Sequence, residues 1–186
     1  MAKMEAYNES RVMVLMSNIS EAGKHIDEVC TWLNGHTGKS IDGNSFGDVM
    51  TAALFGGGLI GMAISKKIRT GLKNKRIIYK GMTADDMGQD IVNRITGMVN
   101  SQIEIQQLVG KEEDCYYGQA NFIYMCWRKY HSAWMMFTSY YSTNHKVDYE
   151  GRRITLEEMV RFQCIRQLQR LDFDENTRKA IEKEQK

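Results

Sequence analysis

Apolar residues recur every three or four positions from about Met4 to Leu33, which predicts a long helix in this part of the chain. Its apolar seam follows a heptad repeat with two positions. The first is occupied by Val12, Ile19, Ile26 and Leu33. The second lies three residues later and is occupied by Leu15, Ala22 and Val29. The seam lasts less than four heptads, so it favours an ordinary bundle helix over a free-standing coiled coil. The glycines at 35, 38, 43 and 47 then predict a loop.

Three later segments begin with a Ser or Thr followed three residues on by an acid, which is the pattern of an N-terminal capping box. The pairs are Ser45 with Asp48, Thr83 with Asp86, and Thr155 with Glu158. They predict helices over about 46–70, 84–109 and 156–170, and Gly71 and Gly110 are suited to end the first two. Two further helices are expected, one over 112–142, where acids occupy the first turn, and a short one from near Asp174.

Strand-forming patterns are confined to RIIY (76–79) and KVDYEGRRI (146–154), and the second predicts a hairpin around Glu150 and Gly151 as an alternative to a loop. No Pro-rich or Ser-rich linker divides the chain, which favours one domain over residues 1–186. The predicted fold class is therefore all-α: a bundle of about five helices with room for a small β-hairpin near 146–154.

The composition supports this fold. With 186 residues and 42% hydrophobic positions the chain can bury a substantial core, and the absence of proline lets long helices run without a break. The formal charge of +2 is too small to indicate nucleic-acid binding by itself. The sequence MAKMEAYNES lacks the apolar core of a signal peptide and the four cysteines form no CxxC pair, so a cytoplasmic protein is expected.

Residues 116–141 hold ten of the 18 aromatic residues. A stripe with helical spacing runs through Ala120, Ile123, Trp127, Tyr130, Trp134, Phe137 and Tyr141. It is widened by Tyr117, Tyr124, Cys126, Ala133 and Tyr140, and Met135 and Met136 are also expected in the core. The pattern favours a central buried helix over a base-stacking platform or a membrane-interface belt.

A glycine-rich segment, VMTAALFGGGLIGMAIS (49–65), contains no charge over 17 residues. Its small residues at four-residue spacing form a ridge that lets another helix approach closely: Ala53, Gly57, Gly61 and Ser65. Four glycines each cost roughly 1 kcal/mol in a helix interior, so this helix is expected to need a neighbour. We interpret the ridge as a helix-packing or oligomer interface. A helix of about 26 Å is slightly short for a membrane span, which remains the alternative.

A basic tail follows the glycine-rich segment over residues 66–80. The rest of the chain has 18 basic and 23 acidic residues. The tail contains no acid and seven cations: Lys66, Lys67, Arg69, Lys73, Lys75, Arg76 and Lys80. Contact with an anionic partner is expected, either an acidic protein face, anionic lipid or nucleic-acid phosphate. Residues 46–70 and this tail could form an appendage to the bundle.

Cofactor and metal sites are not predicted. NGHTGKS (34–40) resembles a phosphate-binding loop, but its first glycine stands two residues too close to Gly38, and a helix rather than a strand is expected before it. His25 and Cys30, like Cys126 and His131, are five residues apart and point in different directions on a helix. Asp172 and Asp174 are interpreted as a turn and a helix cap.

These patterns favour a non-enzymatic structural or adaptor protein of a larger assembly, for example a phage particle or secretion machine, located in the cytoplasm or a virion. Its expected partners are proteins, foremost further copies of itself through the glycine-rich helix, and no small-molecule substrate is expected. A membrane-associated protein anchored by residues 49–65 is the first alternative, and a nucleic-acid-binding module using the tail 66–80 is the second.

Overall fold

The computed structural model describes residues 2–36, 77–110, 113–140 and 143–186, and within these ranges the predicted all-α bundle is confirmed. Five helices are described: α1 (Ala2–His36), α4 (Ala84–Val109), α5 (Glu113–Tyr140), α6 (Leu156–Leu168) and α7 (Glu175–Lys183). Two short antiparallel hairpins accompany them: β1 (Ile77–Tyr79) with β2 (Met82–Thr83), and β3 (Lys146–Tyr149) with β4 (Arg152–Thr155). The described part is thus a helical bundle with small β appendages.

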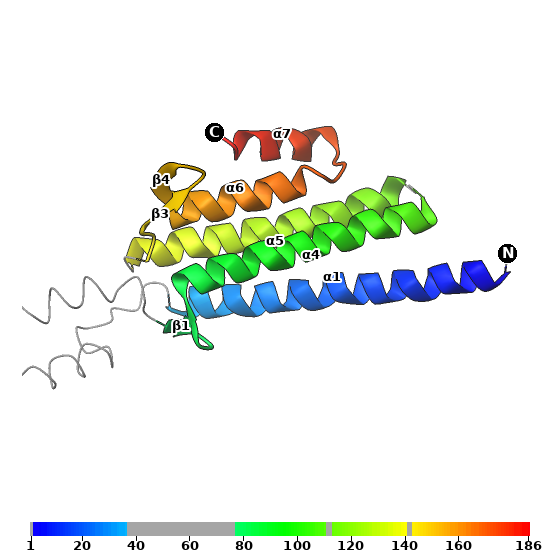
Figure 1. Cartoon of the computed structure of the whole chain (residues 1–186), viewed down its shortest axis with the longest axis horizontal. Coiled ribbons are helices and arrows are strands. Elements are labelled where there is room, and N and C mark those ends of the chain that lie inside the picture. Colours follow the sequence, from blue (N-terminus) through cyan, green and yellow to red (C-terminus); the bar gives the residue numbers. More distant parts are fainter. Residues whose placement is uncertain (1, 37–76, 111–112, 141–142) are drawn as a thin grey trace, which may run out of the picture.

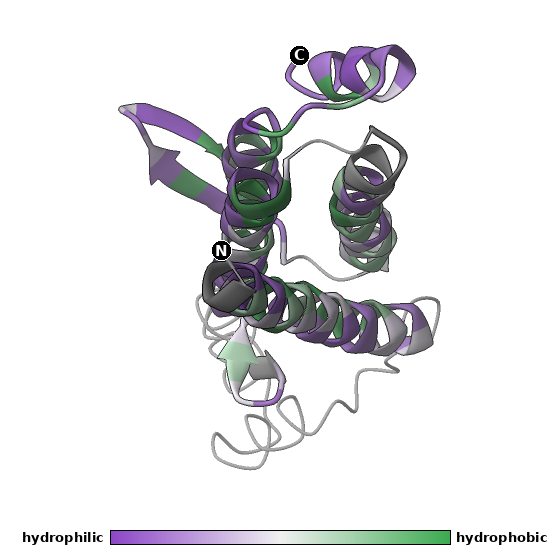
Figure 2. Ribbon diagram, turned by 90° about the vertical axis from the view of Figure 1, so that its right-hand side faces the viewer, coloured by the Kyte–Doolittle hydropathy of each residue, from purple (hydrophilic) through white to green (hydrophobic). Residues whose placement is uncertain are grey.

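The helices α1, α4 and α5 lie side by side along the long axis of the molecule, and α6 covers α4 and α5 (Figure 1). The shorter α7 lies outermost, across the top of the bundle, and most of its length is hydrophilic (Figure 2). The first turns of α1 extend beyond the ends of α4 and α5 (Figure 1), and Leu15 is the first buried one among the described side chains of this helix. The N-terminal part of α1 is therefore a projection from the bundle.

Local capping chemistry sets the helix boundaries. The Thr83 and Thr155 hydroxyls accept hydrogen bonds from the backbone N–H groups of Asp86 and Glu158, and both reciprocal bonds are present, so two of the three predicted capping boxes are confirmed. The third, Ser45 with Asp48, lies outside the described residues. Asp174 caps α7 by accepting a 2.9 Å bond from the Thr177 N–H, as expected. Gly110 ends α4 with φ 76, a conformation that suits glycine.

The predicted hairpin near 146–154 is present. Val147 pairs with Ile154 and Tyr149 with Arg152, and both turn residues, Glu150 and Gly151, have positive φ. The predicted strand at 76–79 is also found, over 77–79, together with a partner at 82–83 that was not predicted. The helix expected over 46–70 lies outside the described residues.

One boundary differs from the prediction. The helix α1 continues through Gly35 to His36, where a loop was expected. The Nδ1 of His36 lies 2.7 Å from the backbone oxygen of Trp32, and its ring stacks on the Trp32 indole with centroids 4.1 Å apart. These contacts support the last helical turn despite the conformational freedom of Gly35.

The core joins the predicted α1 seam to the aromatic stripe of α5. Ile26, Val29 and Leu33 of α1 are at most 1% exposed. The described members of the α5 stripe are also buried, as predicted: Ala120, Ile123, Trp127, Tyr130, Trp134 and Phe137. The α5 helix is therefore a central element of the core.

Candidate functional site

Most of the predicted interface residues lie outside the described part of the chain. This applies to the ridge of Ala53, Gly57, Gly61 and Ser65, and to six of the seven cations of the basic tail, Lys66, Lys67, Arg69, Lys73, Lys75 and Arg76. The seventh, Lys80, lies in the β1–β2 turn, where its Nζ is 3.2 Å from a carboxylate oxygen of Glu28 on α1. The charge of Lys80 is therefore matched within the chain.

The segment resembling a phosphate loop begins on a helix. Asn34, Gly35 and His36 belong to the last turn of α1, so a helix leads into this segment, as expected, whereas a nucleotide-binding loop follows a buried strand. Gly38, Lys39 and Ser40 lie outside the described residues.

Histidines and cysteines are dispersed over the bundle. His25 on α1 faces Asp90 on α4 with 2.9 Å between Nε2 and Oδ2, and His145 faces Asp85 with 2.8 Å between Nε2 and Oδ1. Cys30 and Cys126 are buried, and burial raises their thiol pKa values to about 12 and about 11, respectively. Among the described residues, no group of three His, Cys, Asp or Glu side chains is arranged to hold a metal ion.

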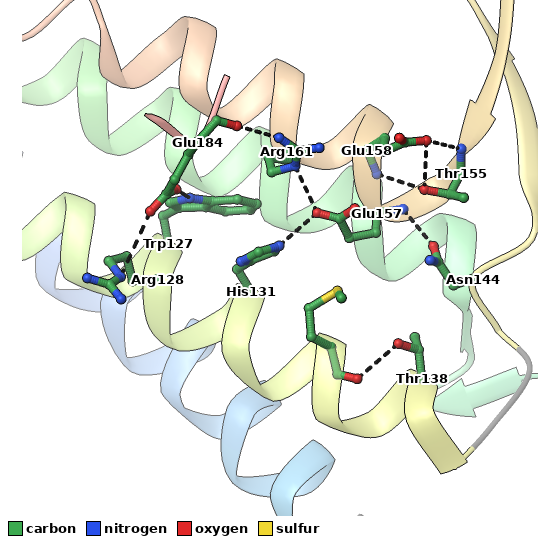
Figure 3. Close-up of polar contacts among 11 residues, drawn as sticks. Trp127, Arg128, His131, Thr138, Asn144, Thr155, Glu157, Glu158, Arg161 and Glu184 are labelled. Atoms are coloured by element: carbon green, nitrogen blue, oxygen red, sulfur yellow. Dashed lines mark hydrogen bonds and ion pairs between the residues drawn. The ribbon is translucent and has the colours of Figure 1, made fainter. Parts of the chain in front are cut away.

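A network of hydrogen bonds connects the C-terminal end of α7 to α5 (Figure 3). The Glu184 carboxylate accepts hydrogen bonds from the Trp127 indole N–H at 2.9 Å and from the Tyr124 hydroxyl at 3.0 Å. Burial and this contact with Glu184 raise the pKa of Tyr124 to about 12. The Arg161 guanidinium of α6 donates to the Glu184 backbone oxygen. One glutamate therefore satisfies two buried ring donors and joins three helices.

The same network continues between α5 and α6 (Figure 3). The Glu157 carboxylate lies 2.7 Å from Nε2 of His131 and accepts a 2.9 Å hydrogen bond from Nε of Arg161. Burial acts to raise the pKa of Glu157, but the contacts with His131 and Arg161 outweigh it and hold this pKa below its usual value. The His131 ring also stacks on Trp127 with centroids 5.1 Å apart. The contacts of the His131 ring with Glu157 and with Trp127 thus both contribute to helix packing.

An apolar groove of about 650 Å³ runs between α1 and α5. Its floor includes Gly23 and Ile26 of α1 and Phe122, Met125 and Cys126 of α5. The Phe122 ring lies so close to Gly23 that a Cβ at position 23 would be 2.8 Å from the ring, and Phe122 is still 46% exposed. A smaller hollow continues the groove toward Met16 and Gln119. This is a surface on which a large apolar ligand or another helix could lie.

Charged residues border the groove on both helices. Lys129 of α5 forms an ion pair with Asp27 of α1 across one end, and Arg128 lies 3.9 Å from Glu184. Lys24 is exposed and forms no ion pair with any other described residue. The groove therefore combines an apolar floor with one cation that lacks a counter-charge in the described part of the chain.

The exposure of two methionines on α5 differs from the prediction. Met135 and Met136 are 46% and 52% exposed, although both were expected in the core, and Phe122 and Met125 are also exposed. The hydrophobicity of Met135 and Met136 was taken as evidence of burial, but the buried stripe of α5 is already filled by larger aromatic side chains. An apolar side chain outside the stripe must face either solvent or a partner.

Comparisons with known proteins leave the family open. No protein-family model matches the chain, and no match was found among curated proteins or among solved structures. Within the described ranges, none of the helices combines the length and apolar character needed to cross a bilayer.

The groove and the Glu184 network were not predicted from the sequence. The α1 side of the groove belongs to a stripe of exposed residues spaced 4, 3, 4 and 4 beside the buried seam: Glu9, Met13, Met16, Ser20 and Lys24. In the sequence, this mixture of polar and apolar residues does not differ from an ordinary solvated helix face. The Glu184 network has no local signal either, since its members come from three separate helices.

Proposed function

We propose that the protein is a non-enzymatic structural or adaptor component of a larger assembly and that it associates with further copies of itself. The observation that carries this proposal is the apolar groove between α1 and α5, beside which Met16, Phe122 and Met125 stay exposed although the bundle has a well-filled core. Exposed apolar patches of this kind commonly mark protein–protein contacts. The best-organised polar side chains, around Glu157 and Glu184, are used in helix packing.

The glycine-rich ridge of residues 53, 57, 61 and 65 is the contact that we propose from the sequence for this self-association. A small-xxx-small ridge permits close helix approach, which offsets the low helix propensity of its glycines. The acidic remainder of the chain is a suitable partner for the basic tail of a neighbouring copy.

A solution experiment tests the proposal. The full chain is purified without detergent, its mass is measured by light scattering, and flotation with anionic liposomes is then assayed. We expect a discrete oligomer that does not float, and Gly57→Leu should dissociate it because the leucine blocks close backbone approach. The matched control Gly56→Leu makes the same change one residue outside the ridge.

Two alternative functions correspond to other outcomes. Aggregation without detergent and flotation that persists at high salt would support a membrane anchor at residues 49–65, because an inserted apolar segment resists screening. A monomer that binds nucleic acid with strong salt dependence would support the basic tail as a phosphate-binding element. A monomer that shows neither behaviour would contradict the proposed self-association.

A further inference from the structure

The N-terminal turns of α1 project from the described part of the bundle, and most of their described side chains are exposed. Figure 1 shows them beyond the ends of α4 and α5, and the described side chains from Glu5 to Ser10 are exposed except Asn8, which is half-buried. A helical segment of this length is marginally stable in water when it lacks tertiary contacts. A neighbour along the projecting turns would stabilise them.

The exposed stripe of α1 has opposite charges at its two ends. Glu9 begins the stripe and Lys24 ends it, and neither forms an ion pair with another described residue. Met13 and Met16, which are 72% and 47% exposed, lie between them. The two charges are 15 residues apart, or about 22 Å along the helix at 1.5 Å per residue.

Such a stripe is complementary to an antiparallel copy of itself. When two α1 helices cross a two-fold axis near Met16, Glu9 of each copy lies opposite Lys24 of the other, and Met13 lies opposite Ser20. The charge pair then occurs twice in the interface, while Met16 of each copy lies near its centre. A parallel arrangement in register would instead place like charges opposite each other, which is unfavourable.

The groove receives the projection in this arrangement. Ser20 and Lys24 border the groove on α1, and the floor of Gly23, Phe122 and Met125 lies beside them. The projecting α1 of a second copy would lie along this floor with Met13 directed into it, in the manner of a helix bound in an apolar groove. Methionine suits such a contact because its side chain adapts to irregular surfaces.

We infer that the α1–α5 groove is a homodimer interface in which the N-terminal turns of α1 from a second copy dock antiparallel, with Glu9 of each copy paired to Lys24 of the other. This inference rests on the proposed self-association and assigns it a second surface, which is separate from the ridge of residues 53–65.

A charge exchange tests the inference. The dimer dissociation constant of the full chain is measured by sedimentation velocity for wild type, Glu9→Lys, Lys24→Glu and the double variant. Each single variant should weaken the dimer about tenfold, because two favourable pairs become repulsive and 1.4 kcal/mol corresponds to a factor of ten. The double variant should restore the constant to within about threefold. Glu21→Lys, an exposed change on another side of α1, should leave it unchanged.

The apolar centre is tested by a pair of adjacent substitutions. Met13→Asp should weaken the dimer at least as much as the single charge reversals, since it places a carboxylate on the apolar floor. Val14→Asp is the matched control because Val14 is 50% exposed but lies on a different side of α1. Far-ultraviolet circular dichroism checks that both variants keep the wild-type helix content, and Met13 is exposed enough that this is expected.

The outcomes separate this inference from the proposed function. A discrete oligomer that Gly57→Leu dissociates but that Glu9→Lys and Met13→Asp leave intact would overturn the groove interface and keep the proposed function. A monomeric wild type would overturn both. A dimer that is weakened by the single charge reversals, restored by the double variant and unaffected by Gly57→Leu would support the groove and contradict the ridge.

Discussion

At the residue scale, the aromatic stripe of α5 provides much of the side-chain volume in the core. Trp127, Tyr130 and Trp134 are 1–2% exposed, and the rings of Tyr130 and Trp134 stack with centroids 6.2 Å apart. The buried tyrosine hydroxyl and indole N–H groups must still find hydrogen-bond partners, as Trp127 does with Glu184. The Trp127 side chain therefore both fills the core and forms a hydrogen bond.

Trp134→Ala is expected to lower the free energy of unfolding by about 3–5 kcal/mol, because it removes a large buried ring and leaves a cavity. The measurement is the midpoint of a urea titration followed by circular dichroism. The neighbouring substitution Met135→Ala serves as control and should cost under about 1 kcal/mol, since Met135 is 46% exposed. Equal effects of the two substitutions would contradict the assignment of the stripe to the core.

At the element scale, α7 is held mainly at its two ends. Asp174 caps its start and lies 3.4 Å from the Asn121 side chain of α5, and Glu184 binds Trp127 just after its end. Between them Ile181 is buried and Ala180 packs against the core. A short helix attached in this way should open locally before the rest of the bundle unfolds.

Asp174→Ala should increase amide hydrogen exchange across residues 175–183 while leaving the exchange of α4 nearly unchanged. The reason is that the substitution removes both the cap of α7 and its contact with Asn121. Glu182→Ala, at an exposed position of the same helix, is the control. Uniform acceleration across all helices would show that α7 is not a separate unit.

Helix boundaries could be predicted from the sequence because their signals are local. Thr83 with Asp86, Thr155 with Glu158, and Gly110 each act within one turn of the helix they begin or end. The groove depends instead on which side of α1 meets α5, and the seam of α1 does not encode that choice. Met136 was wrongly placed in the core for the same reason, because its apolar character does not show whether its side of α5 faces the core or solvent.

At the scale of the whole molecule, acid should destabilise the fold. Hydrogen bonds from the Thr83 and Thr177 backbones lower the pKa values of Asp86 and Asp174, and Arg11 lowers that of Glu104. Glu157 also has a lowered pKa. A carboxylate with a lower pKa in the folded state contributes stability above its unfolded pKa and loses it as the pH falls through the folded pKa.

The free energy of unfolding should therefore be nearly constant from pH 7 to about pH 5 and should decrease steadily below that value. Urea titrations at a series of pH values measure it. Glu157→Gln should reduce the decrease, because the amide no longer changes its protonation. A stability that rises on acidification would contradict the assignment of these carboxylates as ionised partners.

The order of the helices along the chain has a consequence for the protein during its synthesis. The apolar seam of α1 packs against α4 and α5, whose residues are translated more than 40 and 70 positions later, respectively. The ribosome adds about 5–20 residues per second, so this seam stays uncovered for several seconds while the rest of the chain is made. Nascent chains on one polysome would expose identical α1 segments to one another during that interval, and pairing between copies could then precede completion of the bundle.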